Sequence, residues 1–304
     1  MSLTFSVVTP SYNQGQFIER TIQSVLTQSG VAIEYTICDG GSTDETVNIL
    51  KRYKDRLRWV SEPDDGQADA VNKGVAMTHG DIIAWLNSDD IYYPNALAKV
   101  ATVFEANPAL DIVYGEADWI GKNDEVLKAF PTEPWRYNRL KEACFLCQPA
   151  VFFKRSVVDR YGGLDKTLQY CMDYELWLRF GQHTDFYFLP EKLAGSRMYA
   201  SNKTMGQALV AHGEINHMLE AKLGVIPANW LLGYALVKVE KTYGISRYDR
   251  NQTHRFVRLL VQFSCQELMA HNPLAFFKIA PKMIFWFLVP DRAWFRREDI
   301  LALV

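Results

Sequence analysis

The sequence predicts an α/β protein whose main body is a mainly parallel, doubly wound sheet. Short apolar or β-rich runs alternate with helical patterns over the first 105 residues, and the connections between them are short. Polar loops, some of them rich in glycine, follow several of these runs. A chain of 304 residues is long enough for one large core, or for a core and a smaller appendage.

Each expected strand is a short apolar run, and each expected helix has apolar residues at three- to four-residue spacing. The strands are expected at residues 5–9, 33–38, 57–60 and 82–86, and the helices at residues 17–26, 42–53, 68–77 and 95–105. Ser42 followed by Glu45 predicts a capping box for the second helix. Right-handed crossovers would place the loops after the first, second and fourth strands at one edge of the sheet.

The alternation changes after residue 110. Extended runs are expected at residues 111–115, 148–153, 186–189 and 193–199, with a hairpin at residues 119–130 and a short helix at residues 174–180. This mixed α+β pattern predicts a part that completes the sheet and forms the wall of a groove in which an acceptor substrate would bind.

The pattern is helical from residue 205 onward, which predicts two domains, residues 1–204 and residues 205–304. Residues 1–200 carry 20 Lys and Arg against 27 Asp and Glu, whereas residues 201–304 carry 13 against 8. The apolar stretch 273–290 is interrupted by Lys278, Pro281 and Lys282, so we expect an interfacial or a core helix there rather than a membrane span. Basic and aromatic residues at this end favour a membrane-surface element, with a helical cap on the main domain as the alternative. These residues are Trp286, Arg292, Trp294, Phe295, Arg296 and Arg297.

The amino-acid composition indicates which binding partners and which cellular compartment to expect. The formal net charge of −2 gives no reason to expect a nucleic-acid partner. Five scattered cysteines favour reduced thiols in the cytoplasm, and the first residues lack the basic segment of a secretory signal. Cys144 and Cys147 have the spacing of a redox or zinc site, but no second pair accompanies them, so we expect structural thiols.

Two adjacent carboxylates, Asp89 and Asp90, follow the apolar run at residues 82–86. The end of a buried strand is where an open α/β sheet places its ligand, and neighbouring like charges favour a bridging cation. Hard oxygen ligands favour Mg²⁺ or Mn²⁺ over Zn²⁺. Alternatively, Asp89 caps the helix near Asn95 and Asp90 is a solvated loop carboxylate. With Tyr12 and Asp39 in the other two loops, this edge is typical of a nucleotide pocket.

Several stretches together resemble family-2 nucleotide-sugar glycosyltransferases with the GT-A fold. They are VVTPSYNQGQFIERTIQSVLTQ, DGGSTDET, DDGQADAVNKGVAMTHGDIIAWLNSDD, QPAVFF, GGLD and MDYELWLR. The resemblance covers about residues 4–204, and the order of the motifs makes it specific. It implies a GT-A-type doubly wound mixed sheet with a Rossmann-like nucleotide-binding half, beside a C-terminal helical region.

The resemblance also implies roles for single residues. Those implied to bind the donor are Thr9, Pro10, Tyr12, Asp39, Gln67, Asp69, Asn87, Ser88 and Asp89. Asp89 and Asp90 would hold Mn²⁺ or Mg²⁺, and Asp173 would be the general base, with the N-cap of the helix at 174–180 as its alternative role. A closing loop with Arg197, Ser201, Lys203 and Thr204 would clamp the diphosphate. Relatives often have His where this chain has Tyr199, so a metal-ligating histidine is missing.

The implied activity is an inverting, metal-dependent hexosyl transfer of class EC 2.4. A sugar would move from a nucleotide-diphosphate donor to a hydroxyl of a glycan or lipid-linked glycan. The leaving diphosphate needs its developing charge neutralised, and the acceptor hydroxyl needs a carboxylate base. The implied setting is bacterial surface polysaccharide synthesis at the inner face of the plasma membrane, with peripheral membrane contact through the C-terminal region. Two alternatives stay open, a sugar-nucleotide pyrophosphorylase and a non-catalytic sugar-nucleotide- or glycan-binding module.

Overall fold

The computed structural model describes residues 3–199 and 206–290. The chain divides into two compact units, which are described separately. Unit one comprises residues 1–137 and 145–200, and unit two comprises residues 138–144 and 201–304.

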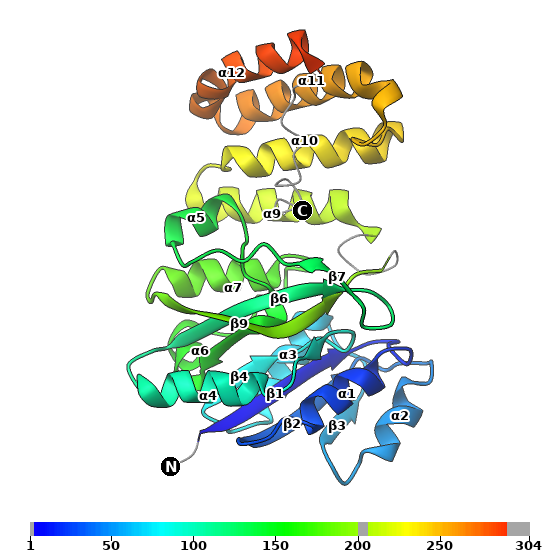
Figure 1. The fold of residues 1–304 in the computed structure, drawn as a ribbon, viewed down its shortest axis with the longest axis vertical. Coiled ribbons are helices and arrows are strands. Elements are labelled where there is room, and N and C mark those ends of the chain that lie inside the picture. Colours follow the sequence, from blue (N-terminus) through cyan, green and yellow to red (C-terminus); the bar gives the residue numbers. More distant parts are fainter. Residues whose placement is uncertain (1–2, 200–205, 291–304) are drawn as a thin grey trace. The chain divides into compact units, whose positions relative to one another are not determined.

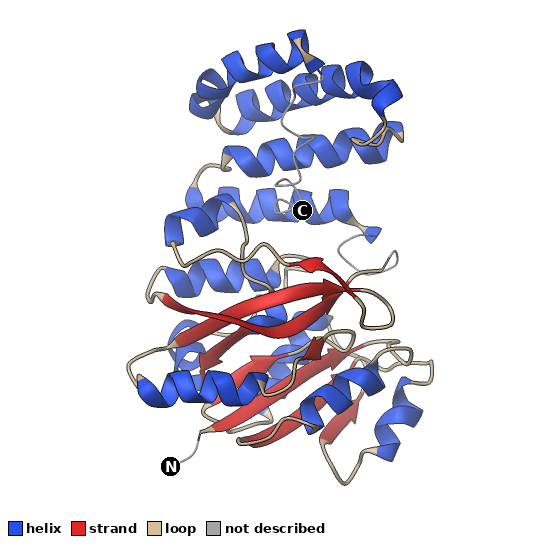
Figure 2. Ribbon diagram, in the orientation of Figure 1, coloured by secondary structure: helices blue, strands red, loops and turns tan. Residues whose placement is uncertain are grey.

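Unit one is built on one nine-stranded mixed sheet (Figures 1 and 2). The strand order is β3-β2-β1-β4-β8-β6-β9-β5, and β7 pairs with β6. The strands are β1 (Thr4–Ser11), β2 (Ala32–Asp39), β3 (Arg58–Ser61), β4 (Ile82–Trp85), β5 (Ile91–Tyr92), β6 (Ile112–Ile120), β7 (Val126–Ala129), β8 (Val151–Lys154) and β9 (Phe186–Arg197). The helices are α1 (Ile18–Leu26), α2 (Thr46–Arg52), α3 (Gln67–Ala76), α4 (Ala96–Ala106), η1 (Gln148–Ala150), α6 (Arg155–Tyr161) and α7 (Met172–Gly181).

The predicted fold class is confirmed, and the sheet has two halves. Strands β3, β2, β1 and β4 are parallel, because helical crossovers connect them. Strand β8 then runs antiparallel to both β4 and β6. The hairpin expected at residues 119–130 is formed by β6 and β7. The apolar core of this unit lies on one face of the parallel half, where β1 contributes Phe5 and Val7. On the opposite face of β1, Ser6 and Val8 are fully buried, as expected for a sheet covered by helices.

Three local predictions differ from the structure. The run expected as a strand at residues 148–153 begins as the 3-10 turn η1, since Pro149 has no N–H to donate to a ladder. The runs expected at residues 186–189 and 193–199 form one strand, β9, whose register against β6 shifts near Glu116. The second helix begins at Thr46, and no side chain caps it, so the predicted capping box is wrong.

Helix α3 approaches β1 closely at Gly74. A Cβ atom there would lie 2.3 Å from Cγ1 of Val8, which is fully buried. We expect Gly74→Ala to lower the free energy of unfolding by about 1–3 kcal/mol, because the packed core cannot absorb the extra methyl group. Chemical denaturation with circular dichroism measures this. The control is Gly213→Ala in α9 (Ala208–Leu223), where no atom lies within 4 Å of the added Cβ. That variant should gain up to about 1 kcal/mol from helix propensity, and an equal response of the two variants would refute the tight packing at Gly74.

The described elements of unit two are all helical (Figure 2). They are α5 (Tyr137–Glu142, in this unit from residue 138), α9 (Ala208–Leu223), α10 (Ala228–Tyr243), η2 (Arg250–Gln252), α11 (Thr253–His271) and α12 (Pro273–Leu288). None of the helices in the described ranges is long and apolar enough to cross a membrane. The basic-aromatic residues predicted at positions 292 and 294–297 lie outside the described residues.

Candidate functional site

The C-terminal ends of β1, β2 and β4 meet at one edge of the sheet. Strand β1 pairs in parallel with β2, with Ser11 opposite Asp39, and with β4, with Val8 opposite Trp85. The polar loops that follow these strands therefore share one edge, as the sequence predicted. A ligand in an open α/β sheet binds at such an edge.

Asp39 ends β2 with its carboxylate buried and hydrogen-bonded. The backbone N–H of Ser42 donates to Oδ2 at 2.9 Å and the Ser61 hydroxyl at 2.7 Å, while the Ser42 hydroxyl donates to Oδ1. Ser42 thus bonds to the buried carboxylate three residues before it instead of capping α2. The Ser42 and Ser61 hydroxyls hold the Asp39 carboxylate in one orientation at this edge of the sheet.

The residues at the end of β1 differ in exposure. Thr9 is fully buried, and its hydroxyl lies 3.2 Å from the Tyr35 hydroxyl. Pro10 is buried as well. Tyr12 is 62% exposed, so among these three predicted donor residues it is the side chain that solvent reaches most freely.

A network of side-chain amides joins α3, β4 and η1 behind the acidic loop. Oδ1 of Asn87 accepts from Gln67 Nε2 and from Trp85 Nε1, both at 2.8 Å. Asn87 Nδ2 donates to Gln148 Oε1 at 2.9 Å, and Gln148 Nε2 donates to the Trp85 carbonyl at 2.7 Å. Sequence reasoning assigned no site role to Gln148. Its place directly before Pro149 and an apolar run was the available signal, but no local pattern shows its partner 61 residues away.

Ser88 and Asp69 are held from neighbouring elements. Ser88 is buried, and its carbonyl accepts from the Thr21 hydroxyl of α1 at 2.9 Å. Asp69, in the first turn of α3, forms ion pairs with Lys166 at 2.9 Å and with Lys73 at 3.3 Å. The hydrogen bond from Lys166 is the main reason that the pKa of Asp69 falls to about 2.

The adjacent carboxylates of Asp89 and Asp90 have different surroundings. Asp90 is buried, and it accepts from the backbone N–H of Arg197 at 2.7 Å and more weakly from Asn87 Nδ2 at 3.4 Å. Burial and the charge of Asp89 raise the pKa of Asp90 well above its usual range. Asp89 is only partly buried, and burial also raises its pKa. The alternative prediction of a helix cap and a solvated carboxylate is wrong, because Asn95 occupies the N-cap of α4 and Asp90 is buried.

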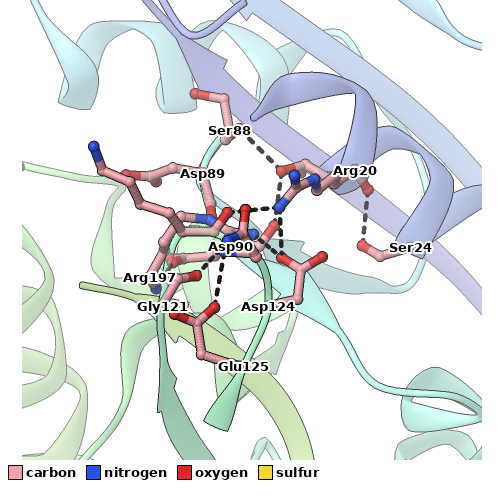
Figure 3. Close-up of polar contacts among 12 residues, drawn as sticks. Arg20, Ser24, Ser88, Asp89, Asp90, Gly121, Asp124, Glu125 and Arg197 are labelled. Atoms are coloured by element: carbon pink, nitrogen blue, oxygen red, sulfur yellow. Dashed lines mark hydrogen bonds and ion pairs between the residues drawn. The ribbon is translucent and has the colours of Figure 1, made fainter. Parts of the chain in front are cut away.

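Arg197, at the end of β9, is turned into the protein (Figure 3). Its Nη1 donates to the Gly121 carbonyl and its Nε to the Asp89 carbonyl, both at 2.6 Å, and Nη2 pairs with Asp124. The guanidinium group also lies 4.7 Å from the centre of the Phe17 ring. These contacts tie β9 to the acidic loop and to the β6–β7 turn. The other predicted clamp residue, Lys203, lies outside the described residues, as do Ser201 and Thr204.

Tyr199 contacts the acidic loop directly. Its hydroxyl donates to Asp89 Oδ2 at 2.8 Å and accepts from Gln14 Nε2 at 3.4 Å. Its ring packs on Phe17, with the ring centres 5.0 Å apart. Tyr199 therefore orients one oxygen of Asp89, a contact that the sequence did not predict.

Asp173 lies in the first turn of α7, next to the N-terminal end of the helix. Cys171 occupies the N-cap position, without a hydrogen bond from its side chain, so the alternative prediction of Asp173 as the N-cap is wrong. Oδ1 of Asp173 accepts from the backbone N–H of Tyr174 at 2.8 Å. Burial raises the pKa of Asp173 to about 6, which is a suitable range for a general base near neutral pH.

The segment before Asp173 is fastened to α3 and α7. Arg179 makes two hydrogen bonds to the buried Glu175, at 3.0 and 2.8 Å, and donates to the carbonyl of Gly163 at 2.7 Å. Asn72 of α3 exchanges two hydrogen bonds with the backbone of Leu164, at 2.8 and 2.9 Å. Together with the ion pair between Lys166 and Asp69, these bonds hold residues 163–166, the segment before Asp173, against α3. The first residue of α3, Gln67, in turn contacts Asn87.

Within the two described ranges, no three His, Cys, Asp or Glu side chains are grouped so that they could hold a metal ion by themselves. Asp89 and Asp90 are the adjacent pair at the sheet edge. Since Asp90 accepts its hydrogen bonds inside the protein, Asp89 is the carboxylate of this pair that lies nearer to solvent.

These features define an α/β protein with a candidate ligand site at the carboxyl edge of its parallel strands. The sequence profile of Glycosyl transferase family 2 matches residues 6–162. The chain belongs to this family.

Relatives and solved structures agree with this assignment. An uncharacterised glycosyltransferase of Rickettsia prowazekii is 29% identical over 213 residues, which cover 66% of this chain and 65% of that protein. The chain spans less than two thirds of the first curated relatives that it matches, and only 31% of one from Rickettsia bellii. S. aureus TarS in complex with UDP-GlcNAc has a TM-score of 0.62 at 16% identity, over 95% of this chain and 88% of that one. The mannosyltransferase PcManGT from Pyrobaculum calidifontis, in complex with GDP-Man and Mn²⁺, has a TM-score of 0.53 at 16% identity, over 99% and 85%. These likenesses show a GT-A-type fold.

Proposed function

We propose that this chain transfers a sugar, with inversion, from a nucleotide-diphosphate donor to a hydroxyl of a glycan or lipid-linked glycan. The observation that carries the proposal is the sheet edge that Asp39 shares with the loop at residues 87–90. The segment before Asp173 is bonded to α3, the helix that leads into β4. Residues 1–204 would be the catalytic domain and residues 205–304 a separate helical region.

The donor is assigned to the edge formed by β1, β2 and β4. Asp39, oriented by Ser42 and Ser61, would accept from the imide N–H of the base, and Tyr12 would cover the base or ribose. The solved structures with UDP-GlcNAc and with GDP-Man support a nucleotide-sugar donor of this kind.

The acidic loop fits a divalent cation held by few protein ligands. Asp89 offers a hard carboxylate oxygen. Burial raises the pKa of both carboxyl groups because it disfavours their ionised form, and a bound cation would stabilise that form. We assign Mn²⁺ or Mg²⁺ to Asp89 and give Asp90 the structural task of binding β9. When bound, the ion supplies positive charge that stabilises the leaving diphosphate. The Mn²⁺ in the structure of PcManGT supports this cofactor.

Asp173 is assigned as the general base. An acceptor hydroxyl becomes nucleophilic as its proton passes to a carboxylate within hydrogen-bond reach, and the partly buried carboxylate of Asp173 has a raised pKa for that task. Inversion requires the base on the sugar face opposite the leaving group. Asp173 lies on α7 and Asp89 in the loop after β4, and we assign the base to the sugar face opposite the ion. Arg197, with its guanidinium inside the protein, is assigned a positioning role toward Asp89.

The test of the donor site is calorimetric titration of the full chain with UDP, GDP and dTDP, with and without Mn²⁺. We expect one nucleotide to bind, more tightly with Mn²⁺ present. Binding of none of the three in either condition would refute the donor site. A sugar-nucleotide pyrophosphorylase lacks support, since the first loop, SYNQGQ, contains no Lys or Arg.

A further inference from the structure

Helix α12 presents a stripe of large apolar side chains to solvent. Five exposed side chains form the stripe, Leu274, Phe277, Ile284, Phe285 and Leu288, and the exposed Pro281 lies among them. At the α-helical repeat these positions fall within an arc of about 100°. Leu274 and Phe277 are 79% and 73% exposed, which is unusual for large apolar side chains so close together.

The opposite face of α12 is the one that packs against the protein. Met283 and Trp286 are 1% and 2% exposed. The helix is therefore apolar on two faces, and within the described ranges only one of them packs against the protein. The second apolar face is available to another partner.

Two lysines lie along one edge of the stripe. Lys278 and Lys282 are exposed, and α12 contains no acidic residue. Arg258 of α11 adds a third cation, 5.9 Å from the ring centre of Phe287. Glu267, an acidic residue on the adjacent helix α11, is already paired with Lys238 at 3.1 Å. The surroundings of the stripe are therefore positively charged.

We propose that the outer face of α12 binds an anionic lipid surface. Its apolar side chains would enter the boundary between headgroups and acyl chains, while Lys278 and Lys282 would contact anionic headgroups. The helix would lie in the plane of that surface, since its 16 residues are too few to span a bilayer.

The positive charge beside the stripe favours an anionic lipid surface over a second copy of the chain as the partner. Two copies joined stripe to stripe would bring like charges together, which opposes association. The membrane contact adds a partner to the proposed function, and it depends on that function only in so far as the acceptor is lipid-linked.

The test is sedimentation of the full chain with phosphatidylcholine vesicles, with or without phosphatidylserine. The stripe variant replaces Leu274, Phe277 and Ile284 by Ser. The matched control replaces three other exposed apolar residues of unit two by Ser, namely Val210, Val225 and Met269. We expect the stripe variant to lose at least ~10²-fold in vesicle affinity, since burying each large apolar side chain contributes about 1.5–3 kcal/mol. The control should bind like the wild type.

A charge variant gives an independent readout. Lys278→Gln with Lys282→Gln should lower affinity for the anionic vesicles about fivefold for each charge removed and leave affinity for neutral vesicles unchanged. The control is Lys54→Gln with Lys241→Gln, two exposed lysines that lie outside α12.

The outcomes that would overturn the proposal are equally specific. Equal vesicle binding by the stripe variant and its control would do so, as would a dimer in analytical ultracentrifugation that only the stripe variant loses. Nucleotide calorimetry on the same samples separates the two proposals. Vesicle binding without nucleotide binding would refute the donor site alone, and nucleotide binding without vesicle binding would refute the lipid surface alone.

Discussion

Asp173→Asn should lower the transfer rate by about 10²–10⁴-fold, the usual contribution of a general base, and leave donor affinity unchanged. The amide keeps the size of the side chain and can still accept from the N–H of Tyr174, but it cannot take a proton from the acceptor. The measurement is steady-state transfer together with donor titration. Asp159→Asn, at an exposed carboxylate of α6, is the matched control and should be fully active.

The pH dependence gives the same prediction a second readout. Because burial raises the pKa of Asp173 to about 6, the wild-type rate should rise as pH increases through about 6, where the carboxyl group loses its proton. The residual activity of Asp173→Asn should lack this acidic limb. The variant should not be less stable at neutral pH, since an ionised buried carboxylate disfavours the folded state there. Wild-type turnover in Asp173→Asn would remove this residue from the mechanism.

Asp89→Ala should weaken binding of the nucleoside diphosphate at least ~10²-fold when Mn²⁺ is present, because even residues that only orient a metal ligand contribute about 10–100-fold. Under chelator, the variant and the wild type should bind equally weakly. Calorimetry with and without Mn²⁺ measures both conditions.

The control for this variant is Asp55→Ala, which removes an exposed carboxylate after α2 and should bind like the wild type in both conditions. Asp89→Ala also removes the acceptor of the Tyr199 hydroxyl, so Tyr199→Phe is needed beside it. If Tyr199→Phe lost as much affinity as Asp89→Ala, the effect would belong to the hydrogen bond between Tyr199 and Asp89 and not to a metal ligand. Equal weakening of Asp89→Ala under chelator would assign Asp89 a structural role.

The parallel half of the sheet could be predicted from the sequence because its signals are local. Apolar runs such as residues 82–86, helical spacing between them and short loops determine which strands are parallel and at which edge their loops lie. Asp39 follows its strand directly, so its place at that edge also follows from the alternation. The capping box at Ser42 failed, because its hydroxyl donates to Asp39 and accepts from the backbone N–H of Asn13, 29 residues away, instead of from the helix.

The sequence by itself determined the fold class, the sheet edge and the family of this protein. Only the tertiary structure decided how neighbouring residues of one kind differ. Asp89 and Asp90 are chemically identical and adjacent, yet Asp90 accepts from a backbone N–H that lies 107 residues away, and Asp89 accepts from a hydroxyl 110 residues away. Such partners meet only after the chain has folded, and burial and hydrogen bonding then turn one carboxylate inward and leave the other toward solvent.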